Sequence, residues 1–369
     1  MDNCVIPHGY KATALGIIPQ EWEVMLLGNL SNSISSGRNK HRDAHGQYPV
    51  FGSTGIIGYS STYEYEGPVI LVARVGANAG TLNFASGQYD VSDNTLIITI
   101  KQNVYDYNFA YNQLTHYKLN KLVFGSGQPL ITSKQLKNIR IPVPPLAEQR
   151  KIAEVLGVWD KAIEKQARLI EKLALRKRAL MQRLLSAKLR LPGFSEPWKK
   201  VKLGDVAELY QPQTIQSEDL SQTGYPVYGA NGLIGYYNNY NHEYPQVVIT
   251  CRGSSCGTVN FTPGKCWITG NAMVLNVDNN RDVNKSFFYY LISNSSFVNL
   301  ISGSGQPQIV RQPLLKFELR IPPLKEQTAI AEVLTASDRE IELAKEKLER
   351  LRRQKRGLMQ QLLTGKKRI

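Results

Sequence analysis

The sequence has few cysteines and no long apolar run. Its 369 residues include four cysteines, Cys4, Cys251, Cys256 and Cys266, far fewer than a disulfide framework needs. A reducing cytoplasm is the simplest setting for such a chain. The longest apolar run lies near Val69–Ala73, whereas a bilayer span needs about 20 residues. The N-terminus also lacks a basic segment followed by an apolar core. We therefore expect a cytoplasmic protein with no membrane partner.

The familiar catalytic motifs are missing too. There is no G-x-x-x-x-G-K-[ST] loop for nucleotide phosphates, no Asn-Pro-Pro-aromatic string of an amino-methyltransferase and no H-E-x-x-H. No acidic residue is followed two positions later by lysine, as in many metal nucleases. Cys251, Cys256 and Cys266 have no histidine at zinc spacing, so we expect small buried thiols there. We predict no catalytic site, cofactor or metal on this chain.

Acidic residues are outnumbered by basic ones. The chain has 45 Lys and Arg against 30 Asp and Glu, a formal charge of +15. Such a balance points to nucleic acid, an anionic surface or an acidic protein. The excess is concentrated at 160–190, with ten basic and three acidic residues, and at 335–369, with eleven and five. A solvated helix face usually balances its signs, so these segments favour an acidic partner or a phosphate backbone.

What the sequence does contain is an internal repeat. PVFGSTGIIGY at 49–59 returns as PVYGANGLIGY at 226–236, and GSGQP at 125–129 returns at 303–307. PPLAEQ at 144–149 returns as PPLKEQ at 322–327. The order is kept and the offset stays between 176 and 178. This period is too long for a solenoid, so the chain is a duplicated unit of a domain followed by a helix.

Each unit begins with a domain of short strands and glycine-containing turns. Segments near 105–122 and 283–301 look more helical. The predicted fold class is α+β, with two pseudo-symmetric mixed α/β domains separated by a long antiparallel two-helix coiled coil. The predicted boundaries are 1–143 for the first domain, 144–188 for the first long helix, 189–321 for the second domain and 322–369 for the second helix.

Both helices carry an apolar seam. Steps of four and three residues give ten positions per helix, of which eight are apolar, counting alanine. The polar exceptions are Gln166 and Lys177 in the first helix and Ser337 and Lys355 in the second. A 3.5-residue repeat held this long predicts a coiled coil, and the domain between the helices favours antiparallel pairing with one domain at each end. The alternative is that each helix packs on its own domain. The seam prediction comprises Ile152, Leu156, Ile163, Ile170, Leu173, Leu180, Ile330, Leu334, Ile341, Leu348, Leu351 and Leu358.

With these repeated motifs, the chain resembles the specificity subunits of type I restriction-modification enzymes over nearly its whole length. The resemblance implies two target-recognition domains, each reading one half of a split double-stranded DNA sequence. It implies that the helices act as a spacer and dock two methyltransferase subunits, and that restriction subunits complete the assembly. S-adenosylmethionine, ATP and Mg would then belong to the partner subunits. Residues 1–19 form an N-terminal lead that the second repeat lacks.

The repeat also separates supporting residues from base-reading ones. If the halves read different DNA, shared residues such as the pair Arg74/Arg252 and the pair Gln128/Gln306 favour scaffold or phosphate roles. Residues that differ at matched positions are better base readers, since Arg and Lys suit guanine edges and Asn and Gln suit adenine. A solvated side chain, or a structural turn for the GSGQP loops, is the alternative. The predicted DNA-contacting residues are Arg38, Lys40, Arg74, Asn78, Gln128, Lys134, Arg252, Ser254, Gln306, Gln308 and Arg311.

Two other functions stay open from the sequence. The chain could be a protein-interaction scaffold built on an antiparallel coiled coil, with its charge serving solubility. It could also be an enzyme with an unrecognised motif. Salt dependence separates DNA binding from the scaffold, because phosphate-driven binding weakens steeply as salt rises. Turnover by the chain alone with S-adenosylmethionine or metal would support an enzyme.

Overall fold

The computed structural model describes residues 6–40, 43, 45–125, 129–229, 232–303 and 305–369. The chain forms two compact units. The first comprises Met1–Ala167 and Glu346–Ile369, and the second comprises Arg168–Lys345. Each unit therefore holds one domain together with part of each long helix. Within the described ranges no helix is long and apolar enough to cross a membrane.

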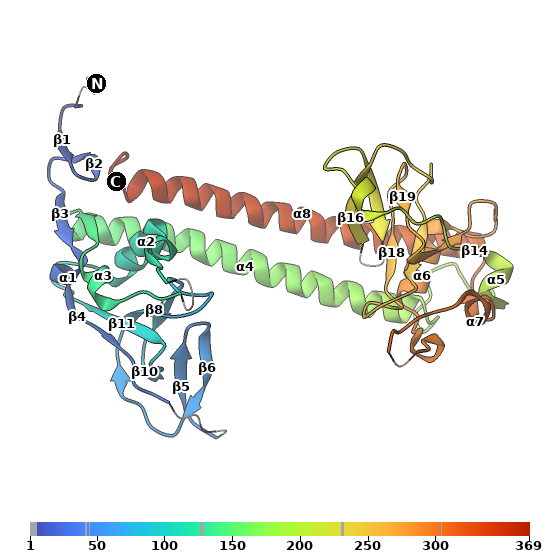
Figure 1. The fold of residues 1–369 in the computed structure, drawn as a ribbon, viewed down its shortest axis with the longest axis horizontal. Helices are drawn as coiled ribbons and strands as arrows, with labels where there is room; N and C mark the ends of the chain where they lie inside the picture. Colours follow the sequence, from blue (N-terminus) through green and yellow to red (C-terminus); the bar gives the residue numbers. More distant parts are fainter. Residues whose placement is uncertain (1–5, 41–42, 44, 126–128, 230–231, 304) are drawn as a thin grey trace. The chain divides into compact units, whose positions relative to one another are not determined.

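The first domain is built around a four-stranded antiparallel sheet with the order β4-β11-β8-β9. Its central strand β8 is buried at every position, as expected for a strand covered on both faces. Ile70 and Val72 join the core that contains helix α2, while Val69 and Leu71 join a second core with β5 and β10. Figure 1 shows α2 beside this sheet. The elements are β4 (Ser31–Ser36), β8 (Val69–Ala73), β9 (Leu82–Ala85), β11 (Thr95–Ile100) and α2 (Tyr107–Tyr117).

In the described part of this domain, a second four-stranded sheet and two strand pairs accompany the main sheet. A second sheet has the order β6-β5-β10-β7, β3 pairs with β12, and β1 pairs with β2. β12 leads directly into the first long helix. These elements are β1 (Tyr10–Thr13), β2 (Gly16–Pro19), β3 (Glu23–Leu26), α1 (Leu27–Leu30), β5 (Tyr48–Gly52), β6 (Gly55–Ser60), β7 (Tyr65–Glu66), β10 (Gln88–Val91), η1 (Leu119–Leu122), α3 (Ser133–Lys137) and β12 (Arg140–Val143).

The second domain repeats this plan. Its main sheet has the order β14-β20-β17-β18, a smaller sheet has the order β16-β15-β19, and β13 pairs with β21. The predicted pair of mixed α/β domains is thereby confirmed, including the helical segments near 105–122 and 283–301. The elements are β13 (Lys199–Lys202), α5 (Leu203–Val206), β14 (Glu208–Tyr210), η2 (Ser217–Asp219), β15 (Tyr225–Gly229), β16 (Gly232–Tyr237), β17 (Val247–Thr250), β18 (Val259–Phe261), β19 (Trp267–Ile268), β20 (Ala272–Asn276), α6 (Lys285–Ser293), η3 (Val298–Leu300), α7 (Arg311–Leu315) and β21 (Glu318–Ile321).

The two long helices are α4 (Leu146–Leu184) and α8 (Leu324–Leu362), each of 39 residues. Within the first unit the start of α4 shares a core with Met359 and Leu362 of α8. Within the second unit Leu184 of α4 shares a core with Ile330 of α8. The helices therefore run antiparallel in each unit, as predicted. All twelve predicted seam residues are buried or half-buried.

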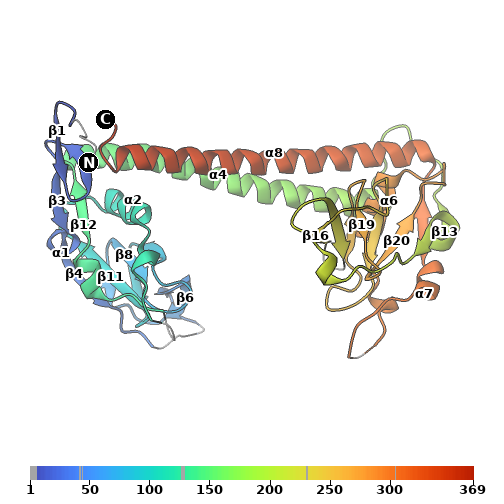
Figure 2. The same ribbon diagram turned by 45° about the horizontal axis from the view of Figure 1, so that its top comes forward.

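The helix ends also pack on the domains. Ile152 and Leu156 belong to the core of the first domain, and Ile330 and Leu334 belong to that of the second. The alternative in which each helix packs on its own domain thus describes the helix starts, while the seam describes the helix–helix contact. At the C-terminal end, Tyr10 Oη donates to the Gly365 carbonyl at 3.2 Å. Accordingly, the end of the chain lies near β1 and β2 in Figures 1 and 2.

Candidate nucleic-acid interface

In the first domain, two loops lie side by side at the end of β8. The Gly76 N–H donates to the Pro129 carbonyl at 2.9 Å, and the Ile131 N–H donates to the Arg74 carbonyl at 2.9 Å. Gly76 has a φ of +77°, a left-handed conformation that favours glycine. Backbone bonds therefore hold the loops, which leaves exposed side chains such as Asn78 free for an outside partner. The predicted contact residue Gln128 lies outside the described residues.

The second domain has the same pair of loops. The Gly253 N–H donates to the Pro307 carbonyl at 3.0 Å, and the Ile309 N–H donates to the Cys251 carbonyl at 2.9 Å. The backbones of Arg252 and Gln308 form an isolated antiparallel β-bridge. The structure thus brings together four exposed residues that the sequence predicted as DNA contacts, namely Arg252, Ser254, Gln306 and Gln308.

The predicted equivalence of Arg74 and Arg252 is wrong by one residue. The Arg74 N–H donates to the Asn94 carbonyl, and the matching donor to Asn271 is Cys251. Arg252 therefore corresponds to Val75. Successive side chains of an extended segment point in opposite directions. The one-residue difference therefore means that the side chains of Arg74 and Arg252 point in opposite directions. The two arginines belong to the set that differs between the domains.

Their surroundings differ accordingly. Arg74 is half-buried and its Nη1 donates to Ser36 Oγ at 3.2 Å, whereas Arg252 is exposed. At the position that matches Arg74, burial raises the pKa of the Cys251 thiol to about 11. Arg252 is thus available to an external partner, while Arg74 links its loop to Ser36 at the end of β4.

The segment that follows β4 carries two further predicted residues. Arg38 and Lys40 are both exposed, and the Arg38 N–H donates to the Val91 carbonyl at 3.0 Å. The Arg38 side chain is 81% exposed and lies 3.7 Å from Glu64, a weak surface pair. The bond from Arg74 to Ser36 places this basic segment near the loops of the first domain.

The remaining two predicted residues lie on short helices. Lys134 is exposed on α3, which begins just after the first loop pair. Arg311 is the first residue of α7 and lines a groove of about 650 Å³. That groove also contains Asp205 and Glu208, so its charge is mixed. Like α3 in the first domain, α7 begins just after the loop pair of its domain, and the DNA role of Arg311 remains a prediction.

The sequence prediction missed a pair of exposed apolar residues. Ile56 on β6 is 53% exposed, and Leu233 on β16 is 50% exposed. They occupy matching positions in the repeated hairpins PVFGSTGIIGY and PVYGANGLIGY. Their presence in both repeats was visible in the sequence, but their exposure was not.

The three cysteines of the second domain have the buried environment that the sequence suggested. Cys251 and Cys266 are buried and Cys256 is half-buried. Cys256 Sγ donates to the Cys251 carbonyl at 3.4 Å. The nearby imidazole ring of His242 is hydrogen-bonded to the side chains of Tyr210 and Asn241. Over the part of the chain that the structure describes, no group of three His, Cys, Asp or Glu side chains could hold a metal ion.

The sequence profile described as the type I restriction modification DNA specificity domain matches residues 19–174 and 195–353. The chain belongs to this family, and its two profile matches coincide with the two repeats. The class of protein that the duplicated fold defines is therefore the type I specificity subunit.

Two curated relatives match over nearly the whole chain. The MjaVIII specificity subunit of Methanocaldococcus jannaschii is 24% identical and covers 95% of this chain and 94% of its own. The putative MjaX specificity subunit of the same organism is 26% identical, with 98% and 97% covered. In fold, the chain is similar to the S subunit of M. genitalium at a TM-score of 0.65 and 19% identity, covering 93% and 96% of the two chains.

Proposed function

We propose that this chain is the non-catalytic specificity subunit that reads a bipartite double-stranded DNA target, one half with each domain. It docks two methyltransferase subunits, and restriction subunits complete the cytoplasmic assembly. S-adenosylmethionine, ATP and Mg belong to those partners. The observation that carries the proposal is the duplicated loop pair, which has the same backbone bonds in both domains and different side chains at matched positions.

The loop chemistry supports base reading. In the second domain, the exposed Arg252 and Gln308 lie opposite each other in a backbone β-bridge. Their side chains suit guanine and adenine edges in the major groove. At the position of Gln308 the first domain has Leu130, and at that of Arg252 it has Val75. Such exchanges at fixed backbone positions would let one scaffold read two different half-sites.

A methylation map tests the proposal. The chain would be expressed with the methyltransferase of its own system in a host free of DNA methylation, and modified bases would be located by long-read sequencing. We expect a split motif with a fixed gap that disappears when this chain is omitted. Replacing residues 20–143 by another first domain should change only one half of the motif. If the complex assembles but no methylation depends on the chain, the protein-interaction scaffold becomes the better explanation.

A further inference from the structure

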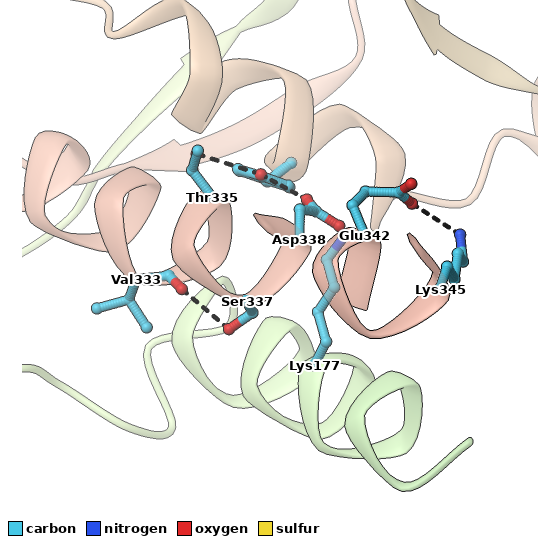
Figure 3. A network of polar contacts seen from close by, with 8 residues as sticks. Lys177, Val333, Thr335, Ser337, Asp338, Glu342 and Lys345 are labelled. Atoms are coloured by element: carbon cyan, nitrogen blue, oxygen red, sulfur yellow. Dashed lines mark hydrogen bonds and ion pairs between the residues drawn. The ribbon is translucent and has the colours of Figure 1, made fainter. Parts of the chain in front are cut away.

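Two lysines occupy positions in the otherwise apolar seam between α4 and α8. The side chains of Lys177 and Lys355 are only 20% and 14% exposed. Each forms an ion pair with an aspartate of the other helix. Lys177 pairs with Asp338 in the second unit, and Lys355 Nζ lies 2.5 Å from Asp160 Oδ1 in the first. Figure 3 shows Lys177 extending from α4 to Asp338 on α8.

The two pairs impose the same register on the helices. Both α4 and α8 are continuous over 39 residues. In an antiparallel helix pair with one register, moving forward along one helix means moving back equally along the other, so the numbers of facing residues add up to a constant. The two lysine–aspartate pairs give the same total and therefore belong to one register. Moreover, Lys355 is the repeat equivalent of Lys177, and Asp338 is that of Asp160. Each helix therefore contributes one lysine and one aspartate.

The lysines distinguish this register from its neighbours, whereas the apolar seam residues do not. An apolar seam returns every seven residues, so a shift by one heptad places leucine against leucine again. The same shift would separate both lysines from their aspartates and leave half-buried ammonium groups unpaired, which is costly. The residues seven positions from the two aspartates are Ala331, Lys345, Ala153 and Ala167.

Another polar seam residue lacks this effect. Ser337 is 8% exposed, but its hydroxyl donates to the Val333 carbonyl of its own helix at 3.0 Å (Figure 3). Because this bond stays within one turn of α8, it would survive any shift of the partner helix. Ser337 therefore carries no register information, in contrast to the lysines of the two lysine–aspartate pairs.

In the second unit the pair is also tied to the domain. Tyr290 on α6 donates its hydroxyl to Asp338 Oδ2 at 2.7 Å. Lys177 Nζ lies 5.3 Å from the Tyr290 ring centre, within cation–π range. The capping residues of α2 and α6 align Tyr290 with Asn112, and Asn112 Nδ2 donates to the Asn108 carbonyl of its own helix at 2.8 Å. At this position the first domain thus has an asparagine that bonds within its own helix, where the second has a tyrosine that donates to Asp338.

We propose that the Lys177–Asp338 and Lys355–Asp160 pairs are positioning residues that hold α4 and α8 in one register, and that this register determines which gap between two half-sites the protein accepts. The second part of the inference rests on the proposed function. It assigns the gap to four side chains that pair between the two helices. Helix length alone does not distinguish one heptad register from the next.

The test uses the full chain assembled with its methyltransferase subunits, on the target identified by methylation mapping. Duplexes carry both half-sites with the gap changed by one or two base pairs, or one half-site only. The variant is Asp160→Asn with Asp338→Asn, which keeps size and removes both ion pairs. The matched control is Glu342→Gln with Glu349→Gln, which makes the same charge change at the exposed pairs with Lys345 and Arg352, both within α8.

We expect the preference of the Asp160→Asn/Asp338→Asn variant for its native gap to fall about tenfold, a coupling typical of side chains in contact. Single half-site binding should stay unchanged, as should the gap preference of the control. Lys177→Met with Lys355→Met should reproduce the loss from the other side of each pair. A native gap preference in both variants would overturn the proposal. Loss of single half-site binding would also overturn it, because the pairs would then only support the fold. If the wild type shows no preferred gap, the proposed function itself fails.

Discussion

Arg368, the penultimate residue, forms an ion pair with Glu148 at the start of α4. Arg368 Nε donates to Glu148 Oε1 at 2.7 Å, and Trp22 Nε1 donates to Oε2 at 3.1 Å. The second unit repeats this arrangement with Arg190 and Trp198 around Glu326. The C-terminal segment therefore supplies the arginine that pairs with the glutamate at the start of α4. The segment after α4 supplies the equivalent arginine for the glutamate at the start of α8.

This relationship predicts that the C-terminal residues stabilise the first unit. Glu148 is 6% exposed, and removing one partner of a buried ion pair costs about 3–5 kcal/mol. Because the Arg368 side chain is 41% exposed, water can partly replace it, and we expect Arg368→Ala to lower the free energy of unfolding by about 2 kcal/mol. Urea denaturation followed by tryptophan fluorescence measures this change. Arg350→Ala, on the exposed face of α8, should change stability by less than about 0.5 kcal/mol. Equal losses in the two variants would contradict the assignment.

The next residue of α4 is also predicted to stabilise the first unit. Gln149 Nε2 donates to the Pro144 and Val104 carbonyls, both at 2.9 Å, and its Oε1 accepts from the Asp106 N–H at 2.8 Å. Gln149→Leu would leave these backbone groups unsatisfied in a site with no exposed surface, costing about 3 kcal/mol or more. We expect a clear drop in melting temperature by calorimetry. Gln182→Leu, on an exposed part of α4, should leave the melting temperature nearly unchanged, and a similar drop there would refute the argument.

Arg252 is predicted to contribute affinity without stability. It is exposed beside Gln308, so Arg252→Ala should leave unfolding unchanged. It should weaken binding to the target by about tenfold to a hundredfold if it reads a base, and mainly at the half-site of the second domain. Fluorescence anisotropy at two salt concentrations distinguishes the roles, because loss of a phosphate contact reduces the salt slope by about one and weakens all sequences alike. Unchanged affinity would remove Arg252 from the interface.

Stability of the second domain should fall in mild acid. Burial lowers the pKa of His242 below its ordinary value of 6.5, an effect that Asp278 partly offsets. The unfolded chain therefore binds the proton more tightly than the folded one. The contribution of the neutral ring is full above the unfolded pKa and is lost as the pH falls through 6.5 toward the folded value.

The measurement is urea unfolding between pH 7.5 and 5. His242→Gln should reduce the slope with which the free energy of unfolding of the second domain changes with pH. Burial likewise lowers the pKa of His116 in the first unit, so some slope will remain and only the difference between variants is diagnostic. An identical slope with and without His242 would be incompatible with this prediction.

Local patterns were enough to predict much of the architecture. The repeat, the glycine-rich strand segments and the 3.5-residue seam are properties of neighbouring residues, so the two mixed α/β domains and the antiparallel helices followed from them. The offset between repeats drifts between 176 and 178. That drift explains the wrong pairing of Arg74 with Arg252, since a one-residue error reverses the direction of a side chain in an extended segment.

The sequence by itself determined that the chain is duplicated, basic and built on two long amphipathic helices, because periodicity and composition need no knowledge of distant contacts. Only the tertiary structure decided that Cys251 matches Arg74, that Arg368 completes the environment of Glu148, and that Lys177 pairs with Asp338. These relationships join residues up to 220 positions apart. They depend on strand registers and on the packing of helices against domains, which only the assembled cores fix.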